Sequence, residues 1–449
     1  MFESLPKELS LIVWSYLSVI DRIKLELVCK AWRQVVCYEN IGPVKLEFST
    51  EKKQEKSLIL ITSMMNKVGP YLRKLALNSF PLKCGKDLLI LKDCHKLENL
   101  EIHLVADLRN NLDFLEESKF LTQLPSSLLS LTLGGSGIKI DSRILSTSLS
   151  QLPPTLKKIS IIIPVTGREF PVDWVENYEN LSVLQLDSTS VTVSGPIEGK
   201  RLTKLEISCL GRGTSRDDGF SCSTVSPCSD LQHLAITASA IRDLSALAIC
   251  DRLTVLHIDL HYCSIDQVLE GLQSSPQLTE LLLKVWISAR SGSSTNFRWP
   301  KLRKLKRFSL FLDREADFNV EQFVEHFVTP GNITSFTYFA HSAPLSPDCI
   351  QRLLDTTSPE LEYFDYRFEN RQSAPSDWIT EWLIRNRSNM TVIRLLKFKM
   401  ETLLAGAAYR ESLLNRSELL PELNVEFRQD TLDYREQEFA KAKMKVWFI

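Results

Sequence analysis

The amino-acid sequence predicts an α/β fold: a small all-helical module followed by a curved solenoid, with an inner parallel sheet and mixed helices and loops on the convex side. Apolar residues recur at helical spacing through the first 40 residues, and a pattern of three apolar residues then recurs through most of the chain. The chain between successive copies is long enough to return over the convex side before the next strand begins.

The first 40 residues contain three segments with the apolar spacing of short helices. Pro6 suits the first turn of the first helix, because the N–H that proline lacks is not needed there. Ser18 and Asp21 are candidates to cap a second helix, and a third segment carries Trp32. Three helices of this size bury too little surface to be stable alone. We therefore expect another surface to cover their apolar face.

These residues resemble an F-box. The family pattern is matched in order by Leu5-Pro6-x-Glu8-Leu9, Ile12, Tyr16-Leu17, Asp21 and Val28-Cys29-Lys30-Ala31-Trp32-Arg33. The chain departs from it at Ser18-Val19, where the family usually has a proline, and near Ile41, where its closing Trp is absent. The resemblance implies docking on the Skp-family adaptor of a cullin-RING ubiquitin ligase. The residues that it assigns to adaptor binding are Leu5, Pro6, Glu8, Leu9, Ile12, Val13, Tyr16, Leu17, Leu25, Val28 and Trp32.

The composition is that of a soluble globular protein. Of 449 residues, 44% are hydrophobic and 24% charged, and the net charge of −1 provides no general attraction to nucleic acid or membranes. The sequence has no membrane-spanning apolar run and no secretory signal. Its ten cysteines include no Cys-x-x-Cys pair, which is typical of reduced thiols. We therefore expect the protein in the cytoplasm, the nucleus or both.

The pattern Lxx(L/I/F)x(L/I/Y) recurs from Leu72 to Leu395, with 21 to 31 residues between successive copies. The copies are Leu72-Leu75-Leu77, Leu97-Leu100-Ile102, Leu128-Leu131-Leu133, Leu156-Ile159-Ile161, Leu181-Leu184-Leu186, Leu202-Leu205-Ile207, Leu231-Leu234-Ile236, Leu253-Leu256-Ile258, Leu278-Leu281-Leu283, Leu305-Phe308-Leu310, Ile333-Phe336-Tyr338, Leu361-Phe364-Tyr366 and Met390-Ile393-Leu395. Weaker copies are Ile41-Val44-Leu46 and Leu420-Leu423-Val425. The last two apolar residues of each copy lie on one side of a strand, so stacked copies form a parallel sheet over a continuous core.

This repeat resembles the leucine-rich-repeat family over residues 41–427, as about 13–15 irregular repeats. The Asn or Cys that usually follows the pattern is missing, so we expect irregular convex loops. Helical spacing predicts convex helices over residues 264–272, 320–328, 348–355 and 378–384. Residues 210–229 and 288–296 are rich in turn formers and predict surface loops. Residues 428–449 predict a C-terminal cap: a charged helix over 429–445 and an apolar tail.

Strand positions between the apolar residues are predicted to face the concave side. They are polar early in the array and become larger and more aromatic later. Aromatic residues and Arg dominate protein interfaces, so we expect a client protein to bind there. The alternative is that the aromatic side chains pack on each other or under the C-terminal helix. The candidate client-binding residues are Trp286, Arg307, Phe311, Phe339, Tyr363, Arg367 and Arg394.

No catalytic, metal or cofactor site is predicted. Gly134-Gly135-Ser136-Gly137 lacks the final glycine of a nucleophile elbow. His257, Asp259 and His261 share one strand face, but they span about 13 Å, too far for one ion. A basic cluster beside Trp299 could bind phosphate, although such a run is more often a solvated loop before a strand. It comprises Arg298, Lys301, Arg303, Lys304, Lys306 and Arg307.

The two resemblances together imply a non-catalytic substrate-recognition adaptor of a ubiquitin ligase complex, which holds an unknown client for ubiquitination and proteasomal degradation. No nucleic acid, membrane or cofactor is expected as a partner. The first alternative is a leucine-rich-repeat scaffold whose N-terminal helices only cap the solenoid. The others are an enzyme with a site in the convex loops and a nucleic-acid binder that uses residues 298–307.

Overall fold

The computed structural model describes only part of the chain. The described residues are 9, 12, 16–17, 19–26, 44–47, 65–81, 88–89, 91–105, 118–136, 140–167, 169–187, 192–199, 201–209, 220–225, 228–239, 241–243, 247, 250–260, 265–285, 300–312, 319–328, 332–340, 345–357, 361–368, 395–399, 425–427 and 447–448. The chain divides into two compact units, Met1–Arg212 and Gly213–Ile449. The boundaries predicted at residues 40 and 427 remain predictions.

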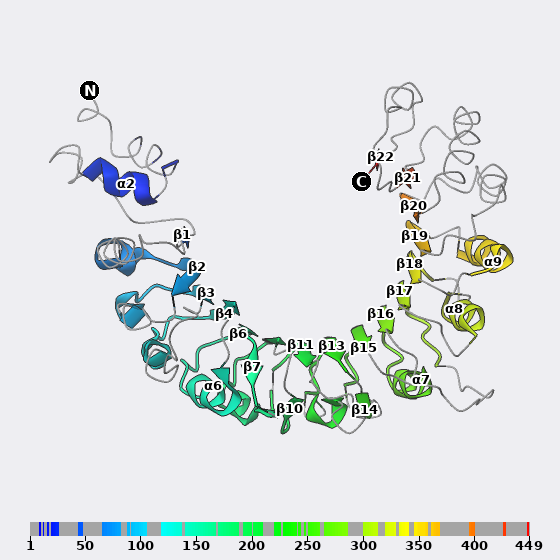
Figure 1. Cartoon of the computed structure of the whole chain (residues 1–449), viewed down its shortest axis with the longest axis horizontal. Helices are drawn as coiled ribbons and strands as arrows, with labels where there is room; N and C mark the ends of the chain where they lie inside the picture. The colour runs from blue at the N-terminus through cyan, green and yellow to red at the C-terminus, as the bar shows by residue number, and fades with distance from the viewer. Residues whose placement is uncertain are drawn as a thin grey trace. The chain divides into compact units, whose positions relative to one another are not determined.

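The first unit contains a parallel sheet whose strands follow one another in chain order (Figure 1). The strands are β1 (Val44–Glu47), β2 (Lys74–Pro81), β3 (Asn99–Val105), β4 (Ser130–Ser136), β6 (Lys158–Ile162), β9 (Val183–Asp187) and β11 (Lys204–Cys209). Each pairs in parallel with the next. Parallel pairing of consecutive strands requires the chain to cross back after every strand, as a repeat fold does.

The second unit is built in the same way. Its strands are β13 (His233–Ala238), β15 (Val255–Leu260), β16 (Glu280–Val285), β17 (Arg307–Leu312), β18 (Ser335–Ala340), β19 (Tyr363–Phe368), β20 (Leu395–Lys399), β21 (Val425–Phe427) and β22 (Trp447–Phe448). Consecutive strands again pair in parallel. The predicted α/β class with a parallel repeat sheet is therefore confirmed.

The apolar triplets form the core as predicted. Leu256, Leu281, Phe308 and Phe336 lie side by side in register on β15 to β18. All four side chains are at most 1% exposed, and so is Leu253, which heads the first of these triplets. The strands alternate buried and half-buried residues along their length. The leucine ladder thus faces the interior, and the positions between its members face the other side of the sheet.

The last predicted triplet is wrong in phase. Leu395 pairs with Tyr363, which is not a ladder position, and Leu396 pairs with the ladder residue Phe364. Val425 pairs with Leu396, so the weaker copy that ends at Val425 is also out of phase. Apolar residues crowd both regions, so more than one frame satisfies the pattern, and only the strand register distinguishes them.

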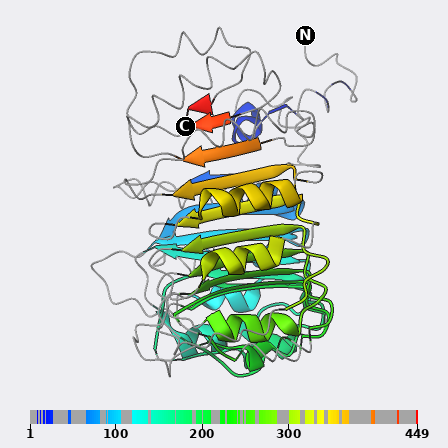
Figure 2. The same ribbon diagram turned by 90° about the vertical axis from the view of Figure 1, so that its right-hand side faces the viewer.

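In the second unit, three of the segments that connect one strand to the next form helices, at the places predicted from the sequence. They are α7 (Ile265–Gln273), α8 (Val320–Val328) and α9 (Pro347–Thr357). Figure 2 shows these green to yellow helices stacked against one face of the strands. Phe323 and Phe327 of α8 pack on Phe308 of β17, with ring centroids 6.3 and 5.2 Å away. The helix predicted over residues 378–384 lies outside the described residues.

The returns of the first unit and of the start of the second are mostly short. They contain α6 (Ser142–Leu149) and the 3-10 helices η2 (Gly69–Tyr71), η4 (Ser118–Gln123), η5 (Asp173–Asn177) and η7 (Cys222–Val225). Small parallel pairs join β5 (Ile140–Asp141) to β7 (Val165–Thr166), β8 (Glu169–Pro171) to β10 (Thr192–Ser194), and β12 (Phe220–Ser221) to β14 (Ile241–Asp243). These irregular returns match the expectation of uneven convex loops.

The surface loop predicted over residues 210–229 is wrong in part. Residues 220–225 form β12 and η7, because Phe220 and Val225, exposed by 1% and 0%, anchor the backbone in the core. Residues 210–219, the loop predicted at 288–296 and the helix predicted at 429–445 lie outside the described residues. In the described part of the chain, no helix has the length and apolar character needed to cross a membrane.

Candidate functional site: an apolar N-terminal face and an open sheet face

The N-terminal segment presents large apolar side chains to solvent. Leu9 and Ile12 are helical, and 49% and 53% of their surface is exposed. Tyr16, one turn further on, is 85% exposed. Their spacing of three and four residues is that of one face of a helix. They are the only exposed large apolar side chains in the described part of the chain.

The following helix, α2 (Val19–Glu26), is fixed to this segment by a buried arginine. Arg22 is 4% exposed, and its Nε donates to the carbonyl of Leu17 over 3.2 Å. Asp21 does not occupy the predicted capping position. It lies inside the first turn, 3.6 Å from the Lys24 ammonium, where its charge suits the positive end of the helix dipole.

Four of the predicted adaptor-binding residues are placed with their side chains: Leu9, Ile12, Tyr16 and half-buried Leu17. Leu25 lies in α2, and its side chain is outside the description. The remaining members of the set lie outside the described residues: Leu5, Pro6, Glu8, Val13, Val28 and Trp32.

The second candidate surface is the face of the second sheet opposite its leucine ladder, here called the open face. It carries most of the predicted client-binding residues on adjacent strands. Arg307 and Phe311 lie on β17, Phe339 on β18, and Tyr363 and Arg367 on β19. Phe311, Phe339 and Arg367 are neighbours in register, and so are Arg307, Ser335 and Tyr363. Trp286 and Arg394 lie outside the described residues.

The aromatic residues of the open face pack partly on one another. The rings of Phe311 and Phe339 lie 6.1 Å apart with an interplanar angle of 38°, and both side chains are half-buried. The hydroxyl of Tyr363 donates to Oδ2 of Asp365 over 3.0 Å, and Asp365 is 1% exposed. The aromatic patch is therefore a packed, partly exposed surface.

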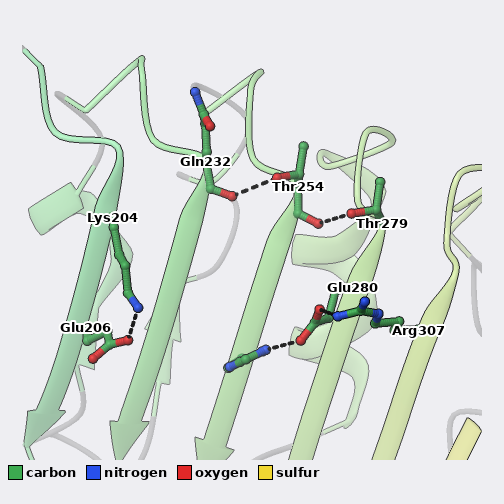
Figure 3. A network of polar contacts seen from close by, with 8 residues as sticks. Lys204, Glu206, Gln232, Thr254, Thr279, Glu280 and Arg307 are labelled. Atoms are coloured by element: carbon green, nitrogen blue, oxygen red, sulfur yellow. Dashed lines mark hydrogen bonds and ion pairs between the residues drawn. The ribbon is translucent and has the colours of Figure 1, made fainter. Parts of the chain in front are cut away.

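Beside the aromatic residues lies a chain of charged contacts that crosses three strands. Glu280 of β16 joins the Nε2 of His257 at 2.8 Å and accepts from Arg307 at 3.2 Å (Figure 3). Lys284 donates to Asp259 over 3.0 Å. Glu280 is absent from the residues predicted from the sequence, because an isolated Glu in a strand carries no signal until the register places it between His257 and Arg307.

The same contacts involve two of the three candidate metal ligands considered in the sequence, His257 and Asp259 of β15. His257 contacts Glu280, and Asp259 contacts Lys284, so the two side chains are engaged by different residues of the neighbouring strand. His261 lies outside the described residues. The described residues contain no group of three or more side chains suited to hold a metal ion.

The side chains of five cysteines are described, and all are buried free thiols: Cys94, Cys209, Cys228, Cys250 and Cys349. Burial raises the pKa of Cys94 to about 11 and that of Cys209 and Cys349 to about 12. Because the thiolate is the nucleophile, these side chains are unsuited to covalent catalysis.

Comparison with known proteins gives one family match and several distant structural similarities. Residues 2–41 match the F-box-like family model. No curated protein matches this chain. Among solved structures, an internalin (inlF) from Listeria monocytogenes is 19% identical with a TM-score of 0.41, over 69% of this chain and 77% of that one.

Two further structures are similar at lower identity. The TLR13–ssRNA13 complex is 14% identical with a TM-score of 0.44, over 90% of this chain and 63% of that one. The leucine-rich repeat-containing protein LegL7 from Legionella pneumophila is 12% identical with a TM-score of 0.32, over 70% of this chain and 97% of that one. The leucine-rich-repeat fold of this chain is carried by its own parallel strands and buried ladder. The chain thus combines an F-box-like segment at residues 2–41 with a parallel sheet of leucine-rich repeats in the described residues that follow.

Proposed function

We propose that this protein is the substrate-recognition subunit of a cullin-RING ubiquitin ligase. Its F-box docks on a Skp-family adaptor, and its repeat domain holds a client protein for ubiquitination. The observation that carries the proposal is the exposure of Leu9, Ile12 and Tyr16 along one face of the F-box-like segment. Exposed apolar side chains gathered in this way mark a protein interaction site.

The energetics of such docking rest on these side chains. Complete burial of a large apolar side chain contributes about 1.5–3 kcal/mol. A carboxylate at the same position would lose that contribution and leave a desolvated charge without a partner. Substitution of two adjacent positions should therefore abolish docking.

The open face supplies the proposed client surface. Phe311, Phe339 and Tyr363 offer ring surface, and Arg307 offers a cation whose side chain is 67% exposed. Aromatic residues and Arg dominate the binding energy of protein interfaces. The proposed client surface also includes Trp286, Arg367 and Arg394. The buried thiols favour action in a reducing compartment, so we place the protein in the cytoplasm or nucleus.

The proposed chemistry of this chain is positional. It contributes no reacting group and raises the effective concentration of a client lysine near a ubiquitin-charged conjugating enzyme. The geometry of a rigid repeat domain suits this role, because each strand is fixed by its two neighbours.

The test is capture of a purified Skp-family adaptor by the full-length chain. The double variant Leu9→Asp, Ile12→Asp should lose capture by at least about 100-fold while keeping its circular dichroism spectrum. A matched control, Gln151→Asp with Ser229→Asp, adds two carboxylates at exposed positions and should bind as the wild type does. Failure of the wild type to capture the adaptor would contradict the proposal. Unfolding of the double variant would instead favour a scaffold whose N-terminal helices cap its own repeats.

A further inference from the structure

A basic surface leads into strand β17. It consists of Lys301, Arg303, Lys304, Lys306 and Arg307, which are all exposed and are called the basic edge below. Between these cations, Leu302 and Leu305 are 5% and 2% exposed. The two leucines anchor the segment in the core, so the cations around them project into solvent.

Backbone hydrogen bonds hold the basic edge on both sides. The N–H groups of Lys306 and Arg307 donate to the carbonyl of Thr279 over 2.8 and 3.0 Å. On the other side, the side-chain amide of Asn332 donates to the carbonyl of Arg303 over 2.8 Å, and the backbone N–H of Thr334 donates to the carbonyl of Lys306. The neighbouring repeats therefore hold the backbone of this segment, while its cations stay exposed in a turn before β17, as the solvated-loop interpretation of the sequence predicted.

The charge of this surface is largely uncompensated. Arg307 pairs with Glu280, and Lys304 donates to the neutral amide of Gln277. Lys301, Arg303 and Lys306 form no ion pair with any described residue. Among the described residues of this unit, Arg252 pairs with Asp230 at 2.8 Å, Lys284 with Asp259 and Arg352 with Glu325. The basic edge thus keeps a local excess of positive charge although the chain as a whole has a net charge of −1.

The position of Lys306 gives an independent argument. Threonine stands immediately before the neighbouring strands β15, β16 and β18, and its hydroxyl donates to the preceding repeat. Lys306 occupies the equivalent position before β17 and has no hydroxyl to donate. An exposed ammonium therefore stands where the neighbouring repeats have a side-chain hydrogen bond, and it forms no ion pair with a described residue.

We infer that the basic edge binds a segment of the client protein rich in Asp and Glu. This inference rests on the proposed function, because it states what the client must carry. Carboxylates on an extended segment would neutralise cations that are spread along one repeat, and complementary charge would also speed association.

The geometry favours carboxylates over phosphate groups. A phosphate site usually combines Arg forks with free backbone N–H groups. Here Arg307 is engaged by Glu280, and the N–H groups of Leu305, Lys306 and Arg307 already donate to carbonyls. Nucleic acid is a poorer fit, because its binding energy comes mainly from neutralising many phosphates, whereas Arg307 of this small surface is already paired with Glu280.

The test measures binding of the full-length protein to a short fluorescein-labelled peptide that alternates Glu and Ser, by fluorescence anisotropy at low ionic strength. The triple variant Lys301→Gln, Arg303→Gln, Lys306→Gln should bind about tenfold more weakly than the wild type. The control variant Lys92→Gln, Arg143→Gln, Lys157→Gln removes the same charge from exposed positions of the first unit and should bind as the wild type does. A peptide of alternating Gln and Ser should not bind.

The outcomes separate this inference from the proposed function. Adaptor capture is measured on the same variants and should be unchanged in both triple variants. No binding of the Glu peptide to the wild type, or equal binding to the wild type and the basic-edge variant, overturns the inference and leaves adaptor docking untouched. Tighter binding of a single-stranded oligonucleotide than of the Glu peptide, with loss in the basic-edge variant, overturns it in favour of nucleic acid.

Discussion

Residues of one type serve opposite purposes in this chain, depending on where the fold places them. Tyr16 is 85% exposed on the N-terminal apolar face, whereas Tyr178 and Tyr338 are 2% and 0% exposed in the core. The phenol of Tyr178 donates to the carbonyl of Leu149, which lies in the preceding repeat. Burial therefore selects which tyrosines are available for binding and which stabilise the stack of repeats.

Removing the hydroxyl of Tyr178 tests this stabilising role. Tyr178→Phe should lower the free energy of unfolding by about 0.5–1.5 kcal/mol at neutral pH, because it removes one of the two hydrogen bonds to the Leu149 carbonyl, which keeps the N–H of Leu152 as a donor. Urea denaturation followed by circular dichroism measures the loss. Tyr16→Phe, at an exposed position, is the matched control and should change stability little.

The pH dependence of the same difference follows from the pKa of Tyr178. Burial raises the pKa of this phenol above its ordinary value, so the folded state disfavours the ionised form. The contribution of Tyr178 to the free energy of unfolding is complete below the pKa of a tyrosine in the unfolded chain, about 10, and is lost as the pH rises above that value. The stability difference between wild type and Tyr178→Phe should accordingly shrink above about pH 10, and a constant difference would contradict the assignment.

At the scale of elements, hydroxyl groups before several strands donate to carbonyls of the preceding repeat. Thr254 donates to the carbonyl of Gln232 and Thr279 to that of Thr254, each over 3.1 Å (Figure 3). Ser182 and Thr203 repeat the contact in the first unit. These hydroxyl contacts lie immediately before the strands.

Replacing one of these threonines by valine keeps its shape and removes its hydroxyl. Thr254→Val and Thr279→Val should each lower the free energy of unfolding by about 0.5–1.5 kcal/mol, since each removes one hydrogen bond between repeats. Urea denaturation measures the effect, and Thr254→Ser, which keeps the hydroxyl, is the control. Unchanged stability in both valine variants would show that the hydroxyl contacts do not hold the repeats together.

The sequence predicts those elements whose apolar pattern has one frame. Residues 320–328 show a single helical face, and α8 spans those residues. The frame of β20 was misjudged because Ile393 fits two overlapping triplets, and only pairing with β19 chooses between them. The contacts of Glu280 and of the threonine hydroxyls join residues 21 to 28 positions apart, so they depend on register and not on local pattern.

At the scale of the whole molecule, the two proposed surfaces belong to different compact units. The apolar face with Leu9 and Ile12 is part of Met1–Arg212, and the basic edge is part of Gly213–Ile449. In the proposed function, each surface acts by holding its partner. Ubiquitination then requires that one polypeptide hold both partners at once, because the gain lies in effective concentration.

A mixing experiment tests this requirement. The substrate is a reporter protein with a Glu-Ser tail, and the assay contains the Skp-family adaptor, its cullin-RING complex and a charged conjugating enzyme. When the reporter is limiting, the wild type should transfer ubiquitin to it. The double variant with Leu9→Asp and Ile12→Asp should not, and the basic-edge triple variant should transfer ubiquitin about tenfold more slowly. Mixing the two variants in equal amounts should be no faster than the basic-edge variant alone, because the molecule that holds the adaptor then binds the reporter poorly. A mixture that regains the wild-type rate would mean that adaptor and client are held by different copies of the chain.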